Sequence, residues 1–190
     1  MINVLYIHGY GSSVTRPGGQ KIDQLGCEFS QVHRIAPNYD LGFESVVGEI
    51  ASFIANAKSE HGVTFSAVIG TSMGGLMAQY IADEISVPYV SINPVMIPRE
   101  SLAKYGVEPF ALVTYPDYSG SSRGMMIVGM QDEVINPYAS VKHARNVYMP
   151  LVMDNAGDHR FEDISGHIDQ IAEFLYSASA HGSYGLVEDY

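Results

Sequence analysis

The sequence predicts an α/β fold, in which a mostly parallel central sheet of about six or seven strands carries helices on both faces. Short apolar runs alternate along the chain with segments whose apolar residues recur every three or four positions, which is typical of parallel strands joined by crossover helices. Only 16% of the residues are charged and 46% are hydrophobic, which excludes wholesale disorder. The length of 190 residues suits one domain with one core.

The amino-terminal part predicts a strand, a short helix and a second strand. The first strand is expected at residues 3–7, because the following loop, His8-Gly9-Tyr10-Gly11-Ser12-Ser13, is too rich in glycine and serine to continue it. A short helix is expected at residues 17–25 and ends at a glycine, whereas the second strand, 31–36, ends at a proline. These elements form the first strand–helix–strand unit.

The middle of the chain contains the clearest helical pattern, at roughly residues 43–59. Its apolar face is formed by Val46, Val47, Ile50, Phe53, Ile54 and Ala57. A third strand is expected at 65–69 and a fourth at 88–92, and the helix between them cannot continue past Pro88. The apolar residues that mark this helix are Leu76, Met77, Tyr80 and Ile81.

The carboxyl-terminal part repeats the alternation of strands and helices. Strands are expected at 125–128 and 151–153, and Asn136-Pro137 supplies an N-cap side chain and a first-turn proline for a helix that ends near Val147. A last helix presents one apolar face, formed by Ile164, Ile168, Ile171, Ala172 and Leu175.

Two segments lack periodicity. Residues 94–123 separate two strands by 30 residues with four prolines, and an insertion of this length is usually functional, so we expect a lid-like segment there. Residues 177–190 gain glycine and serine and are expected to form a loose tail. The expected organisation is therefore a single domain, 1–176, followed by that tail.

Charge and cysteine content exclude several classes of protein. Ten Lys and Arg against 21 Asp and Glu give a net charge of −11, which repels a nucleic-acid backbone. Cys27 is the single cysteine, so an internal disulfide is impossible and a reducing compartment, the cytoplasm, is expected. The start lacks the basic residues of a secretory signal and no apolar run approaches the length of a membrane span, so we expect neither export nor a membrane span.

The segment Gly70-Thr71-Ser72-Met73-Gly74 matches G-x-S-x-G, the motif in which a sharp strand-to-helix turn lifts a serine hydroxyl above a sheet. The glycines are needed because the turn brings neighbouring backbone too close for a Cβ. The alternative is a tight turn with a buried, locally bonded serine. The apolar strand before the motif and the helix after it favour Ser72 as a nucleophile.

A serine nucleophile needs a histidine base and a carboxylate that orients it, and in folds with this turn both follow the serine in the order acid, then base. Asp132 comes directly after the strand 125–128, and His159 lies in the loop before the last helix. Glu133 is the local rival for the acid. Asp154 and Asp158 lie too near the histidine loop for the expected order.

The six other histidines fit other roles. His8 is expected to hold the first glycine loop by hydrogen bonding, and the remainder fall in helices, in the tail or at the surface: His33, His61, His143, His167 and His181. Acyl transfer also needs N–H donors for a developing oxyanion, one after the nucleophile and one from the first loop. The backbone of Met73 and Tyr10 meets this requirement, with Gly11 as the alternative to Tyr10.

Four separated segments point in the same direction: His8-Gly9-Tyr10-Gly11-Ser12-Ser13, Gly70-Thr71-Ser72-Met73-Gly74-Gly75, Asp132-Glu133-Val134 and Gly157-Asp158-His159-Arg160-Phe161. Together they resemble the YqiA/YcfP-like esterases, a group of small, lid-poor α/β-hydrolases of bacteria. The likeness runs from about residue 3 to residue 175 and includes Asn93-Pro94 after the fourth strand. Gln131 stands where members of this family often carry a glycine.

The resemblance implies hydrolysis of a small-molecule acyl ester through an acyl-enzyme, with Ser72 as nucleophile, His159 as base and Asp132 as orienting acid. It implies no metal and no organic cofactor. A thioesterase or an acyltransferase would use the same three residues, because only the leaving group or the acceptor differs. A binding protein that retains this scaffold is a further alternative. Metal-dependent hydrolysis is a weaker alternative, since no H-E-x-x-H motif occurs.

Overall fold

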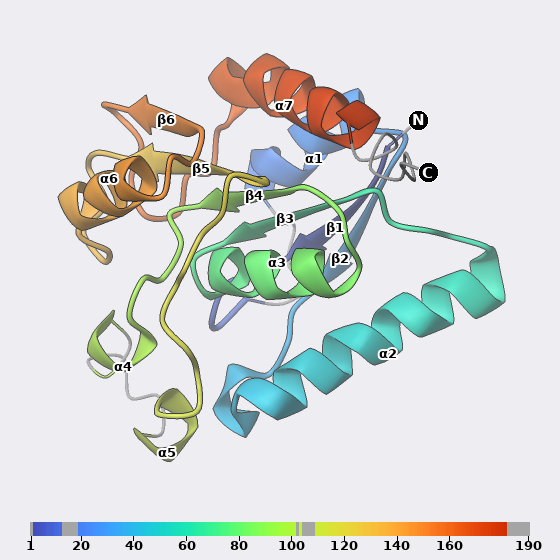
Figure 1. Ribbon diagram of the computed structural model, residues 1–190, viewed down its shortest axis with the longest axis horizontal. Coiled ribbons are helices and arrows are strands. Elements are labelled where there is room, and N and C mark those ends of the chain that lie inside the picture. Colours follow the sequence, from blue (N-terminus) through green and yellow to red (C-terminus); the bar gives the residue numbers. More distant parts are fainter. Residues whose placement is uncertain (1, 13–18, 102, 104–108, 182–190) are drawn as a thin grey trace, which may run out of the picture.

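The computed structural model describes residues 2–12, 19–101, 103 and 109–181, which surround one central sheet (Figure 1). In these residues the sheet has six strands in the order β2-β1-β3-β4-β5-β6, and every neighbouring pair is parallel. The predicted α/β class and mostly parallel sheet are therefore confirmed. The strands are β1 (Asn3–Ile7), β2 (Gln31–Ile35), β3 (Ala67–Thr71), β4 (Tyr89–Ile92), β5 (Gly124–Gly129) and β6 (Leu151–Asp154).

The strand order reverses direction between β1 and β3. The chain runs from β1 outward to β2 on one side, then returns to β3 and continues to β6 on the other. In open α/β sheets ligands bind beyond the carboxyl ends of the strands at such a reversal, because the two loops there leave in opposite directions. In this chain the loop that begins at His8 and the turn that begins at Ser72 leave the sheet at this point.

Helices cover both faces of the sheet (Figure 1). Helices α1 and α7 pack on one face, through a cluster that includes Leu25 and Leu175, whereas α2, α3 and α6 pack on the other, through a cluster that includes Ile50 and Leu76. The described helices are α1 (Gly19–Glu28), α2 (Phe43–His61), α3 (Met73–Glu84), α4 (Pro98–Ser101), α5 (Pro109–Leu112), α6 (Pro137–Asn146) and α7 (Ile168–His181).

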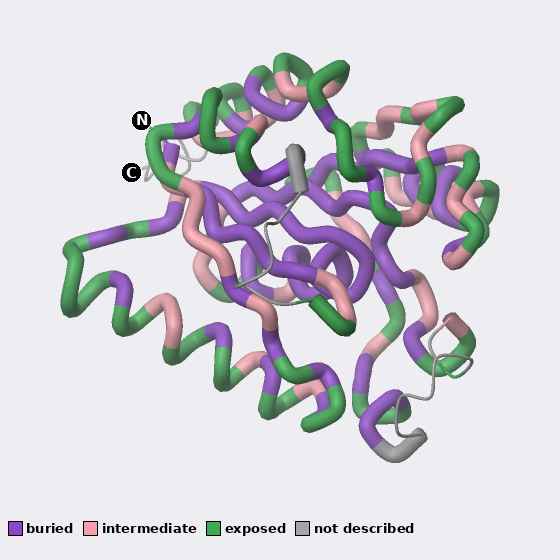
Figure 2. Tube along the Cα trace, turned by 180° about the vertical axis from the view of Figure 1, so that it is seen from behind, coloured by how far each residue is buried: buried purple, intermediate pink, exposed green. Residues whose placement is uncertain are grey.

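Consecutive residues of a strand belong alternately to the two clusters, because the pleat points successive side chains to opposite faces. In β1, Leu5 and Ile7 belong to the cluster under α2 and α3, and Val4 and Tyr6 to the cluster under α1 and α7. Figure 2 shows the result, a continuous buried centre formed by the strands. Because both faces are covered, the central strands β1, β3, β4 and β5 read in the sequence as largely apolar runs, whereas the edge strands β2 and β6 are only partly buried.

Several boundaries differ from the sequence expectation. The strand expected at 65–69 occupies Ala67–Thr71, so it ends at the residue before Ser72. Helix α1 passes through Gly26 and continues to Glu28, since Gly26 is exposed and packs against nothing. The last helix was expected to end near Leu175 with a loose tail from Ser177, but α7 continues to His181, and residues 182–190 lie outside the described part.

The expected lid-like insertion, 94–123, contains two short helices, α4 and α5, and residues 102 and 104–108 of it are outside the described part. Two of its tyrosines are buried. The hydroxyl of Tyr115 donates to the carbonyl of Tyr39 at 2.9 Å, and that of Tyr118 donates to Oγ of Ser91 at 3.0 Å. These two aromatic side chains of the insertion therefore complete the core.

In the described residues, no helix combines the length and the apolar character needed to cross a lipid bilayer.

Candidate active site

Ser72 lies on the sharp turn between β3 and α3, with φ 59° and ψ −121°. This conformation is rare for a residue with a Cβ, and it persists only where the surroundings hold it. The N–H of Ser72 donates to the carbonyl of Ile92 at 2.9 Å. Its own carbonyl accepts from the N–H groups of Leu76 at 3.1 Å and Val95 at 3.2 Å. The turn is thus bonded to β4, to α3 and to the start of the insertion.

The glycines of the turn are required by close backbone contacts. A Cβ on Gly70 would overlap the carbonyl of Gly74, and a Cβ on Gly74 would overlap the carbonyl of Ile7 at the end of β1. The first loop also approaches the serine, because a Cβ on Gly9 would lie 3.0 Å from Cβ of Ser72. The G-x-S-x-G spacing therefore lets β1, β3 and α3 meet around one hydroxyl.

The structure brings Ser72, His159 and Asp132 together in series. Nε2 of His159 lies 3.1 Å from Oγ of Ser72, and Nδ1 of the same ring lies 2.9 Å and 3.1 Å from the two carboxylate oxygens of Asp132. The Asp132 side chain is 1% exposed and that of His159 is 17% exposed. In this arrangement an imidazole that carries its proton on Nδ1 donates to the carboxylate and offers Nε2 to the serine hydroxyl.

Backbone groups orient the Asp132 carboxylate. Its Oδ1 accepts hydrogen bonds from the N–H groups of Val134 and Ile135, both at 2.7 Å, in the turn that leads into α6. Glu133, the rival carboxylate, is exposed and instead accepts from the backbone N–H of His159 at 3.3 Å. The two neighbouring carboxylates therefore have different contacts, and it is Asp132 that reaches the imidazole ring.

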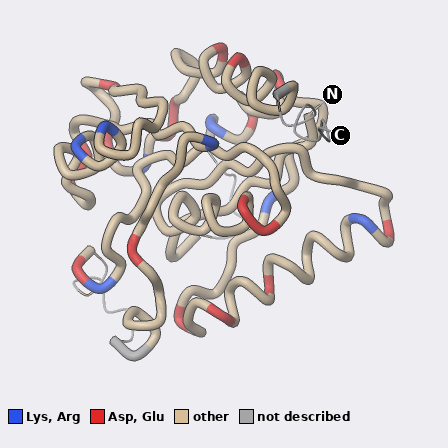
Figure 3. The backbone as a smooth tube through the Cα atoms, in the orientation of Figure 1, with Lys and Arg blue, Asp and Glu red and all other residues tan. Residues whose placement is uncertain are grey.

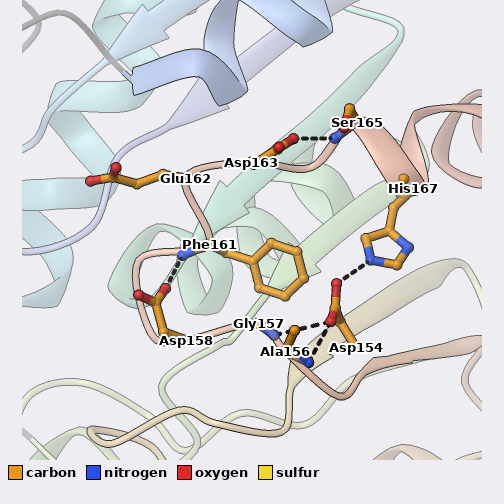
Figure 4. A pocket seen from close by; sticks show the side chains of 10 residues that line it. Asp154, Ala156, Gly157, Asp158, Phe161, Glu162, Asp163, Ser165 and His167 are labelled. Atoms are coloured by element: carbon orange, nitrogen blue, oxygen red, sulfur yellow. Dashed lines mark hydrogen bonds and ion pairs between the residues drawn. The ribbon is translucent and has the colours of Figure 1, made fainter.

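The loop that carries His159 is held by two further carboxylates (Figure 4). Asp154 accepts from two backbone N–H groups of the loop and pairs with Nε2 of His167 at 2.7 Å; the His167 hydrogen bond, followed by these backbone bonds, lowers the pKa of Asp154. Asp158 accepts from the N–H of Phe161 at 2.9 Å. These residues border a cavity of about 420 Å³ beside the loop. Asp154 and Asp158 thus shape the loop, consistent with excluding them as the acid.

Asn93 is a residue of the site that the sequence argument left without a role. It follows β4, is buried, and has φ 44°. Its side chain bonds to the backbone of both the Asp132 loop and the His159 loop. The only signal in the sequence is its place directly after a strand, in Asn93-Pro94.

Lys21 is the second such residue. It is buried on α1, and its Nζ donates to the carbonyl of Arg160 at 2.6 Å and lies 3.5 Å from Oγ1 of Thr71, which accepts or donates a further bond with the hydroxyl of Tyr6. Burial lowers the pKa of Lys21 to about 8, against the opposing effect of nearby carboxylates. Lys21 therefore bridges α1 to the residues next to Ser72 and His159.

His8 was expected to hold the first glycine loop by hydrogen bonding. Its Nε2 is buried and has no partner in the part of the chain that the structure describes. Burial, with Arg34 and Lys21 nearby, lowers the pKa of His8 to about 4. The loop is held through the backbone instead, since the His8 carbonyl accepts from the hydroxyl of Tyr39 at 2.5 Å and its N–H donates to Ile35 at 2.9 Å.

The candidate oxyanion residues lie on either side of the serine. Met73 is the first residue of α3, and Tyr10 lies in the loop whose Gly9 approaches Ser72. The side chain of Tyr10 points to Asp40, to which its hydroxyl donates at 3.3 Å.

The remaining described histidines lie elsewhere: His33 on β2, His61 at the end of α2, His143 on α6 and His167 in the turn before α7, while His181, expected in the tail, is the last residue of α7. Within the described ranges, no three His, Cys, Asp or Glu side chains are grouped as metal ligands would be.

Solved structures with the same fold come from several organisms. The esterase Est1E from Butyrivibrio proteoclasticus is 16% identical, with a TM-score of 0.68 over 96% of this chain and 88% of that chain. The Pyrococcus furiosus esterase Pf2001 is 17% identical, with a TM-score of 0.69 over 93% of this chain and 81% of that chain. Mouse alpha/beta hydrolase domain-containing protein 10 is 12% identical, with a TM-score of 0.60. The fold is that of the α/β-hydrolases, as expected.

Sequence relatives extend over nearly the whole chain. A UPF0227 protein of Pectobacterium atrosepticum is 23% identical over 184 residues, which is 90% of this chain and 97% of the relative. One from Citrobacter koseri is 24% identical over the same length. Residues 3–176 match the family described as "Uncharacterised protein family (UPF0227)". The expected YqiA/YcfP-like kinship is confirmed, and the chain belongs to the UPF0227 family.

Proposed function

We propose that this protein is a serine hydrolase that cleaves small carboxylic esters through an acyl-enzyme intermediate. The observation that carries the proposal is the continuous hydrogen-bonded series from Ser72 Oγ to His159 and from His159 to Asp132. A hydroxyl is a weak nucleophile at neutral pH, and a base within hydrogen-bond distance that is itself oriented by a carboxylate is the arrangement that activates it.

In the acylation step, Oγ of Ser72 attacks the ester carbonyl carbon while Nε2 of His159 takes the hydroxyl proton. The Asp132 carboxylate stabilises the imidazolium that forms, and the two N–H bonds from Val134 and Ile135 keep that carboxylate oriented. When the tetrahedral intermediate collapses, its bond to the leaving oxygen breaks and the imidazolium donates its proton to that oxygen. The alcohol leaves, and the acyl group remains on Ser72.

The negative oxygen of the tetrahedral intermediate is assigned to the backbone N–H groups of Met73 and Tyr10, with Gly11 as the alternative to Tyr10. Two observations support this assignment. Met73 is the first residue of α3, where helix N–H groups are free to bind an anion. Gly9 brings the first loop to within van der Waals distance of Ser72. Loss of one such donor typically raises the barrier by about 3 kcal/mol.

Deacylation reverses the roles of the reacting groups. A water molecule takes the place of the alcohol, His159 removes its proton as the water oxygen attacks the acyl carbon, and the proton returns to Oγ of Ser72 as the acid product leaves. A thiol leaving group or an alcohol acceptor would use the same steps, so a thioesterase or an acyltransferase is the second candidate. Two solved structures with this fold are of esterases, and one of them, Est1E, has been solved with ferulic acid bound, which favours the ester.

The proposal is tested by treating the protein with a fluorophosphonate and locating the adduct by mass spectrometry. We expect one adduct, on Ser72, and its loss in Ser72→Ala. Hydrolysis of nitrophenyl acetate is expected to fall by a factor on the order of 10⁴ or more in Ser72→Ala. Ser140→Ala, which removes a buried serine on α6, is the matched control and is expected to keep activity. An unlabelled Ser72, with equal rates in all three proteins, would favour a binding protein on this scaffold.

The substrate class is tested with nitrophenyl esters and acyl-CoA thioesters of graded chain length. We expect a preference for short acyl chains. An optimum at long chains would contradict this expectation, and faster turnover of thioesters would favour the thioesterase.

A further inference from the structure

Asn93 links both of the loops that carry the acid and the base to the strand beside Ser72. We propose that Asn93 is a positioning residue, whose side-chain amide sets the imidazole of His159 at the distance from Ser72 that proton transfer requires. This inference rests on the proposed function and adds to it a residue outside the Ser72–His159–Asp132 series.

The contacts of Asn93 use both ends of its amide. Its Oδ1 accepts from the N–H of Gly129, the last residue of β5, at 2.7 Å. Its Nδ2 donates to the carbonyls of Asp158 at 2.7 Å and His159 at 3.3 Å. One side chain therefore bonds to the start of the acid loop and to the backbone of the base itself.

The backbone of Asn93 connects the same region to the nucleophile. Its N–H donates to the carbonyl of Ile127 on β5 at 2.9 Å, and the preceding residue, Ile92, accepts the N–H of Ser72. Asn93 thus lies one residue beyond the hydrogen bond that fastens the nucleophile turn to β4. A displacement of its amide would move the acid and base loops relative to that turn.

Asparagine suits this position for two reasons. Its φ of 44° lies in the left-handed region, which asparagine tolerates better than most residues with a Cβ. At 1% exposure the amide exchanges no bonds with water, so its donors and acceptor must be satisfied by protein groups, as they are here. A carboxylate of the same shape would keep the acceptor and lose both donors.

Two variants test the role of the side-chain amide separately from any effect on folding. Asn93→Gly removes the side chain while allowing the positive φ, and Asn93→Asp keeps the shape but cannot donate to the two carbonyls when ionised. We expect kcat for a short-chain nitrophenyl ester to fall about 10- to 100-fold in each variant, with KM changed less than about threefold, because a misplaced base acts on the chemical step. Labelling of Ser72 by a fluorophosphonate should slow by a similar factor.

Ser91→Ala is the matched control. Ser91 is buried on β4, two residues before Asn93. Its hydroxyl donates to the carbonyl of Gly75 at 2.8 Å and accepts from the hydroxyl of Tyr118 at 3.0 Å, and neither bond reaches the acid loop or the base loop. We expect this variant to lose unfolding free energy in urea and to keep kcat within about twofold of the wild type.

A double variant distinguishes positioning of His159 from a general effect on the site. In a His159→Ala background, Asn93→Gly is expected to change the residual rate less than about twofold, because no imidazole remains to be positioned. The inference would be overturned if Asn93→Gly lowered the rate by the same factor in both backgrounds. It would also be overturned if a folded Asn93→Gly protein kept kcat within about twofold of the wild type. If Asn93→Gly does not fold, kcat of Asn93→Asp decides in the same way.

The wild-type protein separates this inference from the proposed function. A wild type that neither reacts with the fluorophosphonate at Ser72 nor turns over esters would overturn the proposed function and the role of Asn93 with it. An active wild type with unaffected Asn93 variants would overturn the role of Asn93 alone.

Discussion

Gly9 leaves just enough room for Ser72 beside the first loop. A Cβ at this position would lie 3.0 Å from the carbonyl oxygen of Thr71 and 3.6 Å from Oγ of Ser72. A contact of 3.0 Å is tighter than most Cβ atoms make, so either the loop or the serine turn would have to shift by a few tenths of an ångström. The position of Ser72 therefore depends on a residue without a side chain, two positions after β1.

Gly9→Ala is expected to reduce kcat/KM for a short-chain nitrophenyl ester by about 10- to 100-fold, because the displaced loop or serine no longer fits the tetrahedral intermediate. The unfolding free energy should fall by about 1–3 kcal/mol, as for other overpacked sites. Steady-state kinetics and urea unfolding measure the two effects. Gly48→Ala, on an exposed part of α2 with nothing near its Cβ, should gain about 0.5–1 kcal/mol and keep wild-type activity. Wild-type kinetics in Gly9→Ala would contradict the tight fit.

Lys21 makes the stability of the protein depend on pH. Burial lowers its pKa from 10.5 to about 8 in the folded chain, while Glu162 and Asp158 act in the opposite direction. Between pH 8 and 10.5 the unfolded chain therefore binds a proton that the folded chain does not, so this residue makes the unfolding free energy rise as pH rises.

The rise is at most about 1.4 kcal/mol per pH unit, and roughly 3 kcal/mol in all. Lys21→Met lacks it. In urea unfolding, the stability of the wild type relative to Lys21→Met should therefore increase from pH 8 to pH 10. A constant difference between the two proteins across this range would show that the ammonium is not desolvated in the folded state.

The three residues that we assign to catalysis could be found from the sequence because each has a local signature. Ser72 lies in a glycine motif between a strand and a helix, and Asp132 and His159 follow strands in the expected order. Asn93 and Lys21 have no such signature, because their roles arise from groups distant in sequence, at residues 129, 158 and 160.

At the scale of whole elements, α6 links the acid loop to β6. Its N-cap, Asn136, accepts from the N–H groups of Tyr138 at 3.0 Å and Ala139 at 3.4 Å, and Pro137 occupies the first turn. The cap lies four residues after Asp132. Asn136 therefore directly follows the turn in which the N–H groups of Val134 and Ile135 orient the Asp132 carboxylate.

Asn136→Ala is expected to lower the unfolding free energy by about 1 kcal/mol, since two helix N–H groups lose their acceptor. Thermal unfolding measures this change, and Asn136→Asp, which retains the acceptor, should restore most of the loss. Activity should fall much less than in Asn93→Gly, because Asp132 keeps its own bonds to Val134 and Ile135. Equal stability of Asn136→Ala and the wild type would mean that solvent replaces the cap.

Element order could be predicted from the sequence, whereas element boundaries depended on distant partners. β3 extends to Thr71 because it pairs with β4 from Val68 to Thr71, and this register is not visible in the apolar run itself. α7 begins after the short 3₁₀ turn Ser165–His167 and continues to His181. Ser177, Ala178 and Ser179 break the apolar period but are tolerated in a helix, and the next glycine comes at residue 182.

The whole molecule carries a net charge of −11, and carboxylates occur along α2, at the end of α3 and on α7 (Figure 3). A field of this sign slows the approach of anions and is screened by salt. If kcat/KM for an acyl-CoA thioester is measured, it should rise several-fold between about 10 mM and about 200 mM salt. For a neutral nitrophenyl ester the same change should alter kcat/KM less than about twofold. Parallel responses of the two substrates would show that the overall charge does not influence encounter.

The packing of α7 against α1 has a consequence for how the protein is made. The amino-terminal helix and the last helix share one apolar cluster, and Gln24 on α1 accepts from the N–H of Ile164 at 2.9 Å, just before α7. A nascent chain that has left the ribosome only as far as β6 lacks both the helix that covers this side of the sheet and the loop that bears the imidazole. The proposed base therefore cannot reach Ser72 until the residues after β6 have been made, and until then the apolar side of the sheet that α7 covers stays exposed.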